Sequence, residues 1–210
     1  MSLTASTMME LGTEIPSFSL PDVRTGKMVR VPEQCALGPI LVMFICRHCP
    51  YVIHVKSELA RIGRDYAGKV SIVAISSNDA GYVAEDSPGR LKEMAEELGF
   101  NFPLCYDETP DVATSFSAAC TPDIFLFDKD RRLAYRGQID GGRPGNSVPV
   151  DGRDLRAAHA TLVKNGLNDS HFDAVARHLQ ATLNELKVPA ALAAQVMTIA
   201  ASTRSDVLGR

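Results

Sequence analysis

The sequence predicts an α/β domain with a central mixed sheet, followed by an all-helical extension. Over the first 150 residues, short apolar runs typical of buried strands alternate with amphipathic stretches typical of helices. A segment rich in Gly and Pro, "DGGRPGNSVPVDG" at 140–152, then reads as a loop and boundary, and the pattern beyond it is purely helical. We therefore expect two parts, residues 1–150 and residues 151–210.

The first buried strand is predicted at "PILVMFIC", residues 39–46. This run is short, apolar and bounded by Gly38-Pro39, which favours a strand covered on both faces. A helix should follow from Pro50, because proline suits the first helical turn. The apolar residues after it keep helical spacing, at Tyr51, Val55, Leu59 and Ile62.

Further elements of the first part follow from the same patterns. The segment 87–100 has Ser87 as a helix cap, Pro88 in the first turn and Gly99 as the stop. The other expected elements are a buried strand at 69–76, a helix at 109–118, and two strands within 123–137 joined by the turn "DKDR".

The extension is expected to contain three amphipathic helices. A short one ends at Asn165-Gly166, a long one starts near Asn168 or Asp169, and the last opens after Val188-Pro189. Their apolar stripes need a covering surface, so we expect a homodimer whose extensions pair as a four-helix bundle. The stripe residues are Phe172, Val175, Leu179, Leu183 and Leu186 on one helix, and Leu192, Val196, Ile199 and Val207 on the other.

Composition narrows the functional class. The chain has 210 residues, of which 45% are hydrophobic and 22% charged, and its net charge of −3 argues against nucleic-acid binding. The N-terminal segment lacks the pattern of a signal peptide, and no apolar run reaches membrane-spanning length, so we expect a cytoplasmic protein without membrane partners. Five cysteines in such a chain favour redox or metal chemistry over structural disulfides.

The motif "FICRHCPYV" contains Cys46 and Cys49 in C-x-x-C spacing, for which zinc binding, an inert buried pair and a redox pair are the alternatives. A structural zinc site needs about four ligands, and no second C-x-x-C is present, so we expect no metal. The junction of strand and helix favours a redox pair, because helix N-terminal N–H groups stabilise a thiolate. Cys46 is expected to be the more exposed and more acidic thiol, beside the positive charge of Arg47 and His48; a solvated His48 is the alternative.

A second motif, "ACTPD" at 119–123, precedes a predicted strand. Together with the C-x-x-C it resembles the thioredoxin superfamily, and more closely the peroxiredoxin-like redoxins with C-x-x-C-P, from about residue 11 to residue 157. Other segments that carry this resemblance are "LGTEIPSFSLPDVRTGKMVRV", "YDETPDVATSF" and "RGQIDGGRPGN". The resemblance implies a thioredoxin-like fold and a cis peptide bond before Pro122.

The resemblance also implies a thiol–disulfide oxidoreductase, in which Cys46 attacks a substrate disulfide and Cys49 resolves the mixed disulfide. Its partners would be a protein disulfide, or a small thiol or peroxide, and a thiol reductant. Glu58 is a candidate proton acceptor for Cys49, with a solvated surface role as the alternative. The expected substrate-binding residues are Arg47, His48, Thr121 and Pro122.

Peroxide reduction is the rival activity. Peroxiredoxins carry T-x-x-C-P, and here Cys49-Pro50 occupies the C-P position while Cys46 replaces the threonine. Cys49 would then attack peroxide and Cys46 would resolve the sulfenic acid. Arg136 or Arg143 could supply an activating guanidinium, with a surface charge as the alternative. Cys120 is expected near the pair, either as a redox group or as a small core residue; Cys35 and Cys105 are interpreted as structural.

Residues 151–208 resemble the second half of a truncated haemoglobin of the first group. In that family the histidine of the "AAHATL" helix is the proximal haem ligand, and here it falls on His159. The family's distal helices are missing, because the chain upstream is redoxin-like. A partly buried or surface role for His159 is therefore favoured over haem binding, and no cofactor is expected to be required.

Overall fold

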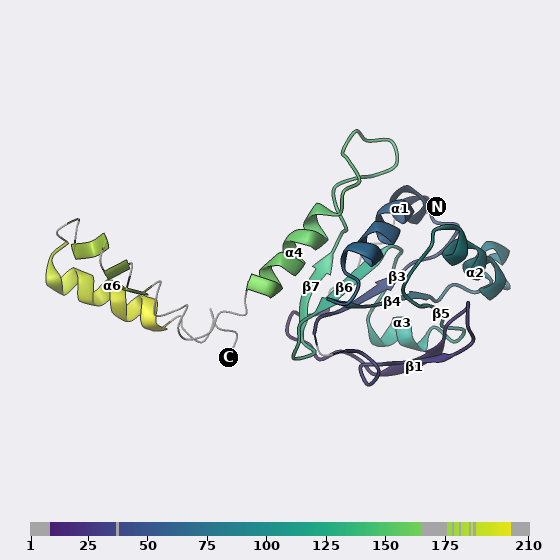
Figure 1. Cartoon of the computed structure of the whole chain (residues 1–210), viewed down its shortest axis with the longest axis horizontal. Coiled ribbons are helices and arrows are strands. Elements are labelled where there is room, and N and C mark those ends of the chain that lie inside the picture. Colours follow the sequence, from purple (N-terminus) through teal and green to yellow (C-terminus); the bar gives the residue numbers. More distant parts are fainter. Residues whose placement is uncertain are drawn as a thin grey trace. The chain divides into compact units, whose positions relative to one another are not determined.

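Figure 1 shows the computed structural model, which describes residues 9–36, 38–164, 176–177, 179–180, 182–184, 186 and 188–202. The chain divides into two compact units, residues 1–158 and residues 159–210. The division falls a few residues after the predicted boundary at residue 150.

A mixed five-stranded sheet forms the centre of the first unit, as predicted. Its strand order is β5-β4-β3-β6-β7, with β3, β4 and β5 parallel and with β6 and β7 antiparallel to their neighbours. Residues of β3, β4 and β6 are almost all buried, which explains their continuous apolar sequences. The strands are β3 Ile40–Phe44, β4 Ser71–Ser76, β5 Leu104–Tyr106, β6 Asp123–Phe127 and β7 Leu133–Gly137.

The N-terminal hairpin forms a separate two-stranded sheet, with β1 (Phe18–Pro21) antiparallel to β2 (Met28–Val31). In Figure 1, this hairpin and α3 (Asp111–Ser115) lie on one side of the central sheet, and α1 (Pro50–Asp65) and α2 (Pro88–Glu97) lie on the other. The short 3-10 helix η1 (Ala84–Asp86) directly precedes α2. The sheet is therefore covered on both faces, as a buried parallel core requires.

An aromatic cluster supports the end of the central strand β3. The ring of Phe44 makes edge contacts with Phe116 at 5.4 Å and with Phe125 at 5.7 Å between centroids. Phe116 also contacts Phe18 from the hairpin at 5.8 Å, and all four rings belong to one buried cluster. The C-x-x-C motif begins two residues after Phe44, so this packing fixes the base from which the motif extends.

Most of the predicted elements are confirmed, with shorter bounds. Helix α2 begins at Pro88, with Ser87 at the cap position, although the Ser87 side chain makes no capping hydrogen bond. Strand β5 was not predicted, because it has three residues and lacks the length that a pattern needs. Helix α4 (Arg153–Lys164) continues from the first unit into the second.

In the second unit, helix α6 (Ala190–Ser202) opens directly after Val188-Pro189, as predicted. Three residues of its expected stripe, Leu192, Val196 and Ile199, are exposed. Phe172, Val175 and Val207 lie outside the described residues. Across the part of the chain that the structure describes, no helix has both the length and the apolarity to cross a membrane.

Helix α1 packs closely against the segment before β5 at Gly63, where a side chain has no room. A Cβ atom at this position would lie 2.4 Å from Asn101 Oδ1 and 2.7 Å from the Phe102 ring. Glycine to alanine inside a helix normally stabilises by roughly 0.5–1 kcal/mol, but here overpacking should exceed this gain, at roughly 1–3 kcal/mol. We predict that Gly63→Ala lowers the urea midpoint of unfolding.

The matched control is Gly89→Ala in α2, where an added Cβ has no neighbour within 4 Å. This variant should be at least as stable as the natural chain. Equal midpoints for the two variants would show that α1 can shift away from Asn101 without cost.

Candidate active site at the cysteine pair

The motif lies between β3 and α1, and the helix starts after its second cysteine. Helix α1 begins at Pro50, and Cys49 is its N-cap residue, with extended backbone angles of φ −68° and ψ 124°. The first N–H groups of a helix have no partner inside the helix, so they are oriented toward the N-cap side chain. Cys49 therefore occupies the position where the helix best stabilises a negative charge.

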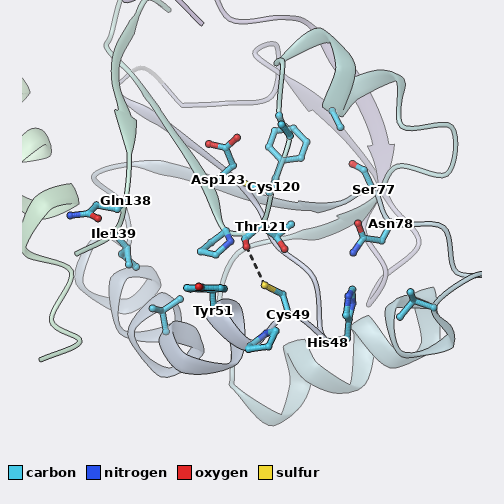
Figure 2. A pocket seen from close by; sticks show the side chains of 18 of the residues that line it. His48, Cys49, Tyr51, Ser77, Asn78, Cys120, Thr121, Asp123, Gln138 and Ile139 are labelled. Carbon is cyan, nitrogen blue, oxygen red and sulfur yellow. Dashed lines mark hydrogen bonds between the residues drawn. The ribbon is translucent and has the colours of Figure 1, made fainter. Parts of the chain in front are cut away.

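Both cysteines are unbridged and both contact Thr121. Cys46 Sγ lies 3.1 Å from Thr121 Oγ1, and the thiol of Cys49 donates to the Thr121 carbonyl oxygen at 3.1 Å (Figure 2). The peptide bond between Thr121 and Pro122 is cis, which confirms that prediction. The second sequence motif is thus brought directly against the first.

Cys46 is not the exposed thiol that the sequence predicted. Its exposed fraction is 1%, whereas that of Cys49 is 9%. Cys49 lines a pocket of about 1170 Å³ and Cys46 does not. The prediction was wrong because it assumed that the chain reaches the surface directly after the strand. Cys46 is instead buried in the segment between β3 and the start of α1 at Pro50.

The expected order of acidity is also reversed. The pKa of Cys49 is lowered to about 5 by a hydrogen bond from the Cys46 thiol, by Thr121, and by the N–H groups of Val52 and Tyr51. The pKa of Cys46 is raised by its hydrogen bond to Cys49 and by burial, and the carboxylate of Asp86 raises it further. The proton of the pair is therefore held on Cys46, and the negative charge is favoured on Cys49.

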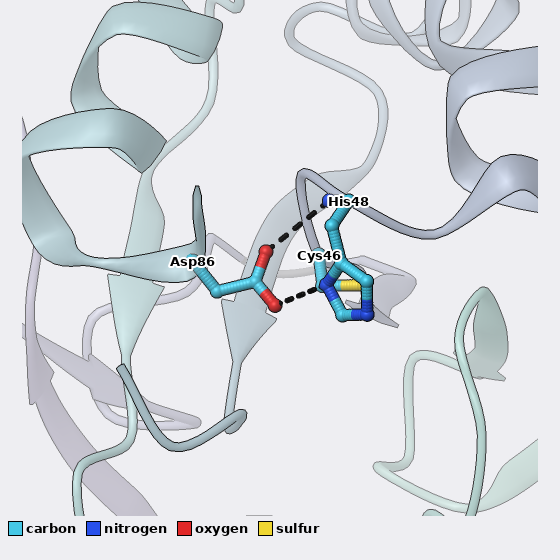
Figure 3. A group of neighbouring side chains, drawn as sticks. All are labelled: Cys46, His48 and Asp86. Atoms are coloured by element: carbon cyan, nitrogen blue, oxygen red, sulfur yellow. Dashed lines mark hydrogen bonds and ion pairs between the residues drawn. The ribbon is translucent and has the colours of Figure 1, made fainter. Parts of the chain in front are cut away.

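Asp86 is a buried acid that the sequence analysis missed. Its Oδ1 accepts hydrogen bonds from the backbone N–H groups of Arg47 at 2.8 Å and His48 at 3.3 Å. Its Oδ2 lies 2.5 Å from His48 Nδ1 (Figure 3). The same oxygen accepts a hydrogen bond from Asn78 Nδ2 at 2.7 Å. In the sequence, Asp86 looks like any acid beside a helix start, and nothing in the local pattern marks it as buried.

The positive groups between the cysteines have defined partners. The guanidinium of Arg47 pairs with Glu85 of η1. Its positive charge is therefore engaged by that carboxylate. His48 lines the pocket while Asp86 holds its ring, so it is not a freely solvated side chain. Of the four expected substrate-binding residues, the pocket is lined by His48, Thr121 and Pro122.

Glu58 lies on α1 but is occupied by other charges. It is 4% exposed and pairs with Arg61 at 2.6 Å and with Arg156 at 2.7 Å. A surface role is therefore wrong for this residue. Its carboxylate joins α1 to the start of α4.

The two arginines proposed for peroxide activation differ in their surroundings. Arg136 is buried, which rules out a surface charge; it pairs with Asp123 at 2.8 Å and donates to the Ser117 carbonyl oxygen at 2.8 Å. Arg143 lines the pocket and donates to the carbonyl oxygens of Asp140 and Gly142. Arg143 is thus the guanidinium that shares the pocket with Cys49.

The other sulfur atoms and the histidine of the extension lie in different surroundings. Cys105 is buried in the core, where burial raises its pKa to about 12, and Cys35 packs against the same core. Cys120 lines the pocket together with Cys49. His159 is half-buried on α4, at the first position of the second unit.

Comparisons with known proteins identify the family and the fold of the first unit. The sequence matches the AhpC/TSA family over residues 11–136. An uncharacterised conserved protein from Geobacillus kaustophilus is 48% identical, with a TM-score of 0.73 over 76% of this chain and 85% of that chain. The thioredoxin domain of a thiol-disulfide oxidoreductase from Bacteroides vulgatus shares the fold, with a TM-score of 0.55 at 15% identity over 72% of this chain and 99% of that domain.

The extension resembles a different family. A group 1 truncated haemoglobin from Synechocystis is 48% identical over 69 residues, which are 31% of this chain and 56% of the haemoglobin. The chain thus spans about half the length of that curated relative. The fusion and the thioredoxin-like fold inferred from the sequence are confirmed, and over residues 11–136 the chain belongs to the AhpC/TSA family of redoxins.

Proposed function

We propose that the chain is a thiol peroxidase in which Cys49 is the nucleophile and Cys46 the resolving thiol. The observation that carries this proposal is the position of Cys49, which caps α1 and lines the pocket while Cys46 is buried behind it. This reverses the roles expected from thioredoxins and agrees with the C-P position of peroxiredoxins.

The reaction has two chemical steps. The Cys49 thiolate attacks one oxygen of a hydroperoxide; the S–O bond forms, the O–O bond breaks, and the leaving alkoxide takes a proton from water to become an alcohol. The Cys46 thiol then attacks the sulfenic sulfur, the S–S bond forms, and the hydroxyl leaves as water with the Cys46 proton. An external dithiol reduces the disulfide and becomes oxidised itself.

The surroundings of Cys46 suit the second role. It is protonated when Cys49 is ionised, so it donates a hydrogen bond to the thiolate in place of the missing threonine hydroxyl. Thr121 Oγ1 and the Asp86 carboxylate lie on its other sides. Both thiols also contact the same residue, Thr121, which places them on one side of the motif loop.

Reduction of disulfides by Cys49 is a second candidate. The pocket of about 1170 Å³ exceeds the needs of a small hydroperoxide, and Thr121 and Pro122 border it. A peptide disulfide could enter such a space. Insulin reduction and hydroperoxide consumption, measured on the same preparation, separate the two activities.

For the extension we propose an assembly role rather than haem binding. The exposed side chains of Leu192, Val196 and Ile199 on α6 would be covered in a homodimer. Each buried leucine or valine contributes roughly 1.5–3 kcal/mol, so pairing of these faces would stabilise an isologous contact.

Alkylation should identify Cys49 as the acidic thiol. Because its thiolate is stabilised by Cys46 and by the start of α1, iodoacetamide should label Cys49 first, well below the ordinary thiol pKa of about 8.5. Labelling across pH, followed by peptide mass spectrometry, measures the order. Faster modification of Cys46 would contradict the proposed polarity of the pair.

Hydroperoxide turnover should separate the two cysteines. We expect Cys49→Ser to lose hydroperoxide consumption by at least about a hundredfold, because the thiolate at the start of α1 is removed. Cys46→Ser should still form one sulfenic acid per chain, trapped by dimedone, but should not form the disulfide. Cys35→Ser is the control and should turn over normally; sulfenic acid on Cys46 in Cys49→Ser would assign the roles the other way.

Removal of the residues after Asn165 should give a monomer that retains thiol chemistry. The reason is that the pocket lies entirely within residues 44–144 of the first unit, while the stripes lie in the second. Light scattering on the full-length and truncated chains measures the mass. A monomeric full-length protein at micromolar concentration would rule out the assembly role.

A further inference from the structure

We propose that the reduced protein binds a divalent transition-metal ion such as zinc through Cys46, His48 and Asp86. The Cys46 Sγ, a ring nitrogen of His48 and a carboxylate oxygen of Asp86 lie within 4.8 Å of one another (Figure 3). This is a mixed thiolate, imidazole and carboxylate set, which suits zinc or cobalt. The site requires reduced cysteines, as the proposed function also does, but it does not require that peroxide is the substrate.

The spacing is compatible with one shared ion. Zinc takes sulfur at about 2.3 Å and nitrogen or oxygen at about 2.0–2.2 Å, so tetrahedral ligands lie roughly 3.3–3.8 Å apart. The three donor atoms already lie within 4.8 Å of one another, so small rotations of the side chains would bring them to this geometry. The two donors separated by 2.5 Å, His48 Nδ1 and Asp86 Oδ2, must move apart slightly to admit the ion.

The ion would replace a proton. In the metal-free protein, a hydrogen bond of 2.5 Å joins His48 Nδ1 and Asp86 Oδ2 at the place that the ion would take. Ligation needs a thiolate, a carboxylate and a neutral imidazole, which together carry two negative charges. A divalent ion neutralises both of these charges in a buried place, and its binding releases protons.

The carboxylate is held in position by groups other than the ion. Asp86 Oδ1 accepts the backbone N–H groups of Arg47 and His48, so the acid and the motif loop are fixed to each other. Asn78 Nδ2 orients Oδ2 from the opposite segment. Supporting hydrogen bonds of this kind orient the ligands of metal sites.

Access and the fourth ligand are also provided. The His48 side chain is 34% exposed and lines the pocket, so an ion can enter from that side. The guanidinium of Arg47 pairs with Glu85 and leaves the three donors unblocked. A water molecule would complete the four-coordinate site, as in zinc sites that have three protein ligands.

A site of this kind depends on the redox state of the pair. When Cys46 and Cys49 form a disulfide, the Cys46 thiolate is lost as a ligand and the ion is released. A bound ion, in turn, occupies the lone pair of Cys46 that would attack the sulfenic sulfur of Cys49. The metal would therefore protect the reduced pair and inhibit its thiol chemistry.

Cobalt titration of the full-length chain tests the site. The protein is reduced, freed of reductant and kept without oxygen, and Co²⁺ is added while the near-ultraviolet and visible spectra are recorded. We expect a sulfur-to-cobalt charge-transfer band with the visible bands of tetrahedral cobalt, saturating at one ion per chain and displaced by Zn²⁺. The disulfide form should show neither band.

Variants separate this site from binding by the cysteines alone. Asp86→Asn and His48→Ala should each weaken cobalt binding by at least about tenfold, and Cys46→Ser should weaken the charge-transfer band. Glu85→Gln, a neighbouring acid outside the donor set, should bind as the natural chain does. Because Asp86→Asn also loses a structural anchor, His48→Ala is the second test that leaves the Asp86 contacts to the backbone in place.

Two results would overturn the proposal. Reduced protein without the charge-transfer band has no thiolate site, and unchanged affinity in both His48→Ala and Asp86→Asn would assign the ion to the cysteines alone. Hydroperoxide turnover of the metal-free protein is measured separately. Loss of cobalt binding with normal turnover, or the reverse, therefore shows which of the two proposals has failed.

Discussion

The start of α1 at Pro50 is the constraint on which the site depends. Because the helix begins after the second cysteine and not before it, Cys49 is the N-cap residue, and the helix N-terminus lowers its pKa although its side chain makes no capping hydrogen bond. The same choice leaves Cys46 on the last extended residues after β3, beneath the surface. One helix boundary thus decides which sulfur faces the pocket and which carries the proton.

The buried acids of the first unit show how similar residues acquire different functions. Glu58 and Asp86 are both almost fully buried, yet Glu58 is neutralised by two arginines, whereas Asp86 is held by backbone N–H groups, an amide and the ring of His48. The first is a structural ion pair between helices. The second lies beside Cys46 and raises the pKa of that thiol.

The sequence predicted the fold well because the fold is encoded in local patterns. Clear apolar patterns and clear ends marked the strands β3, β4 and β6 and the helices α1 and α2, which both begin with proline. The Thr121–Pro122 motif identified the loop that contacts the cysteines. The polarity of the pair could not be predicted in the same way. The sequence placed the start of α1 at Pro50 correctly, but the burial of Cys46 depends on contacts with Thr121 and Asp86, which are distant in the sequence.

Asp86 escaped prediction for a related reason. Its contacts with Arg47 and His48 join positions 38 to 39 residues apart, and they form only because η1 is placed beside the motif loop. The absence of a second C-x-x-C argued against metal binding on sequence spacing alone, yet a ligand set is defined in space. Once Asp86 is included, Cys46 has an imidazole and a carboxylate within 4.8 Å, and these three residues form the donor set of the proposed metal site.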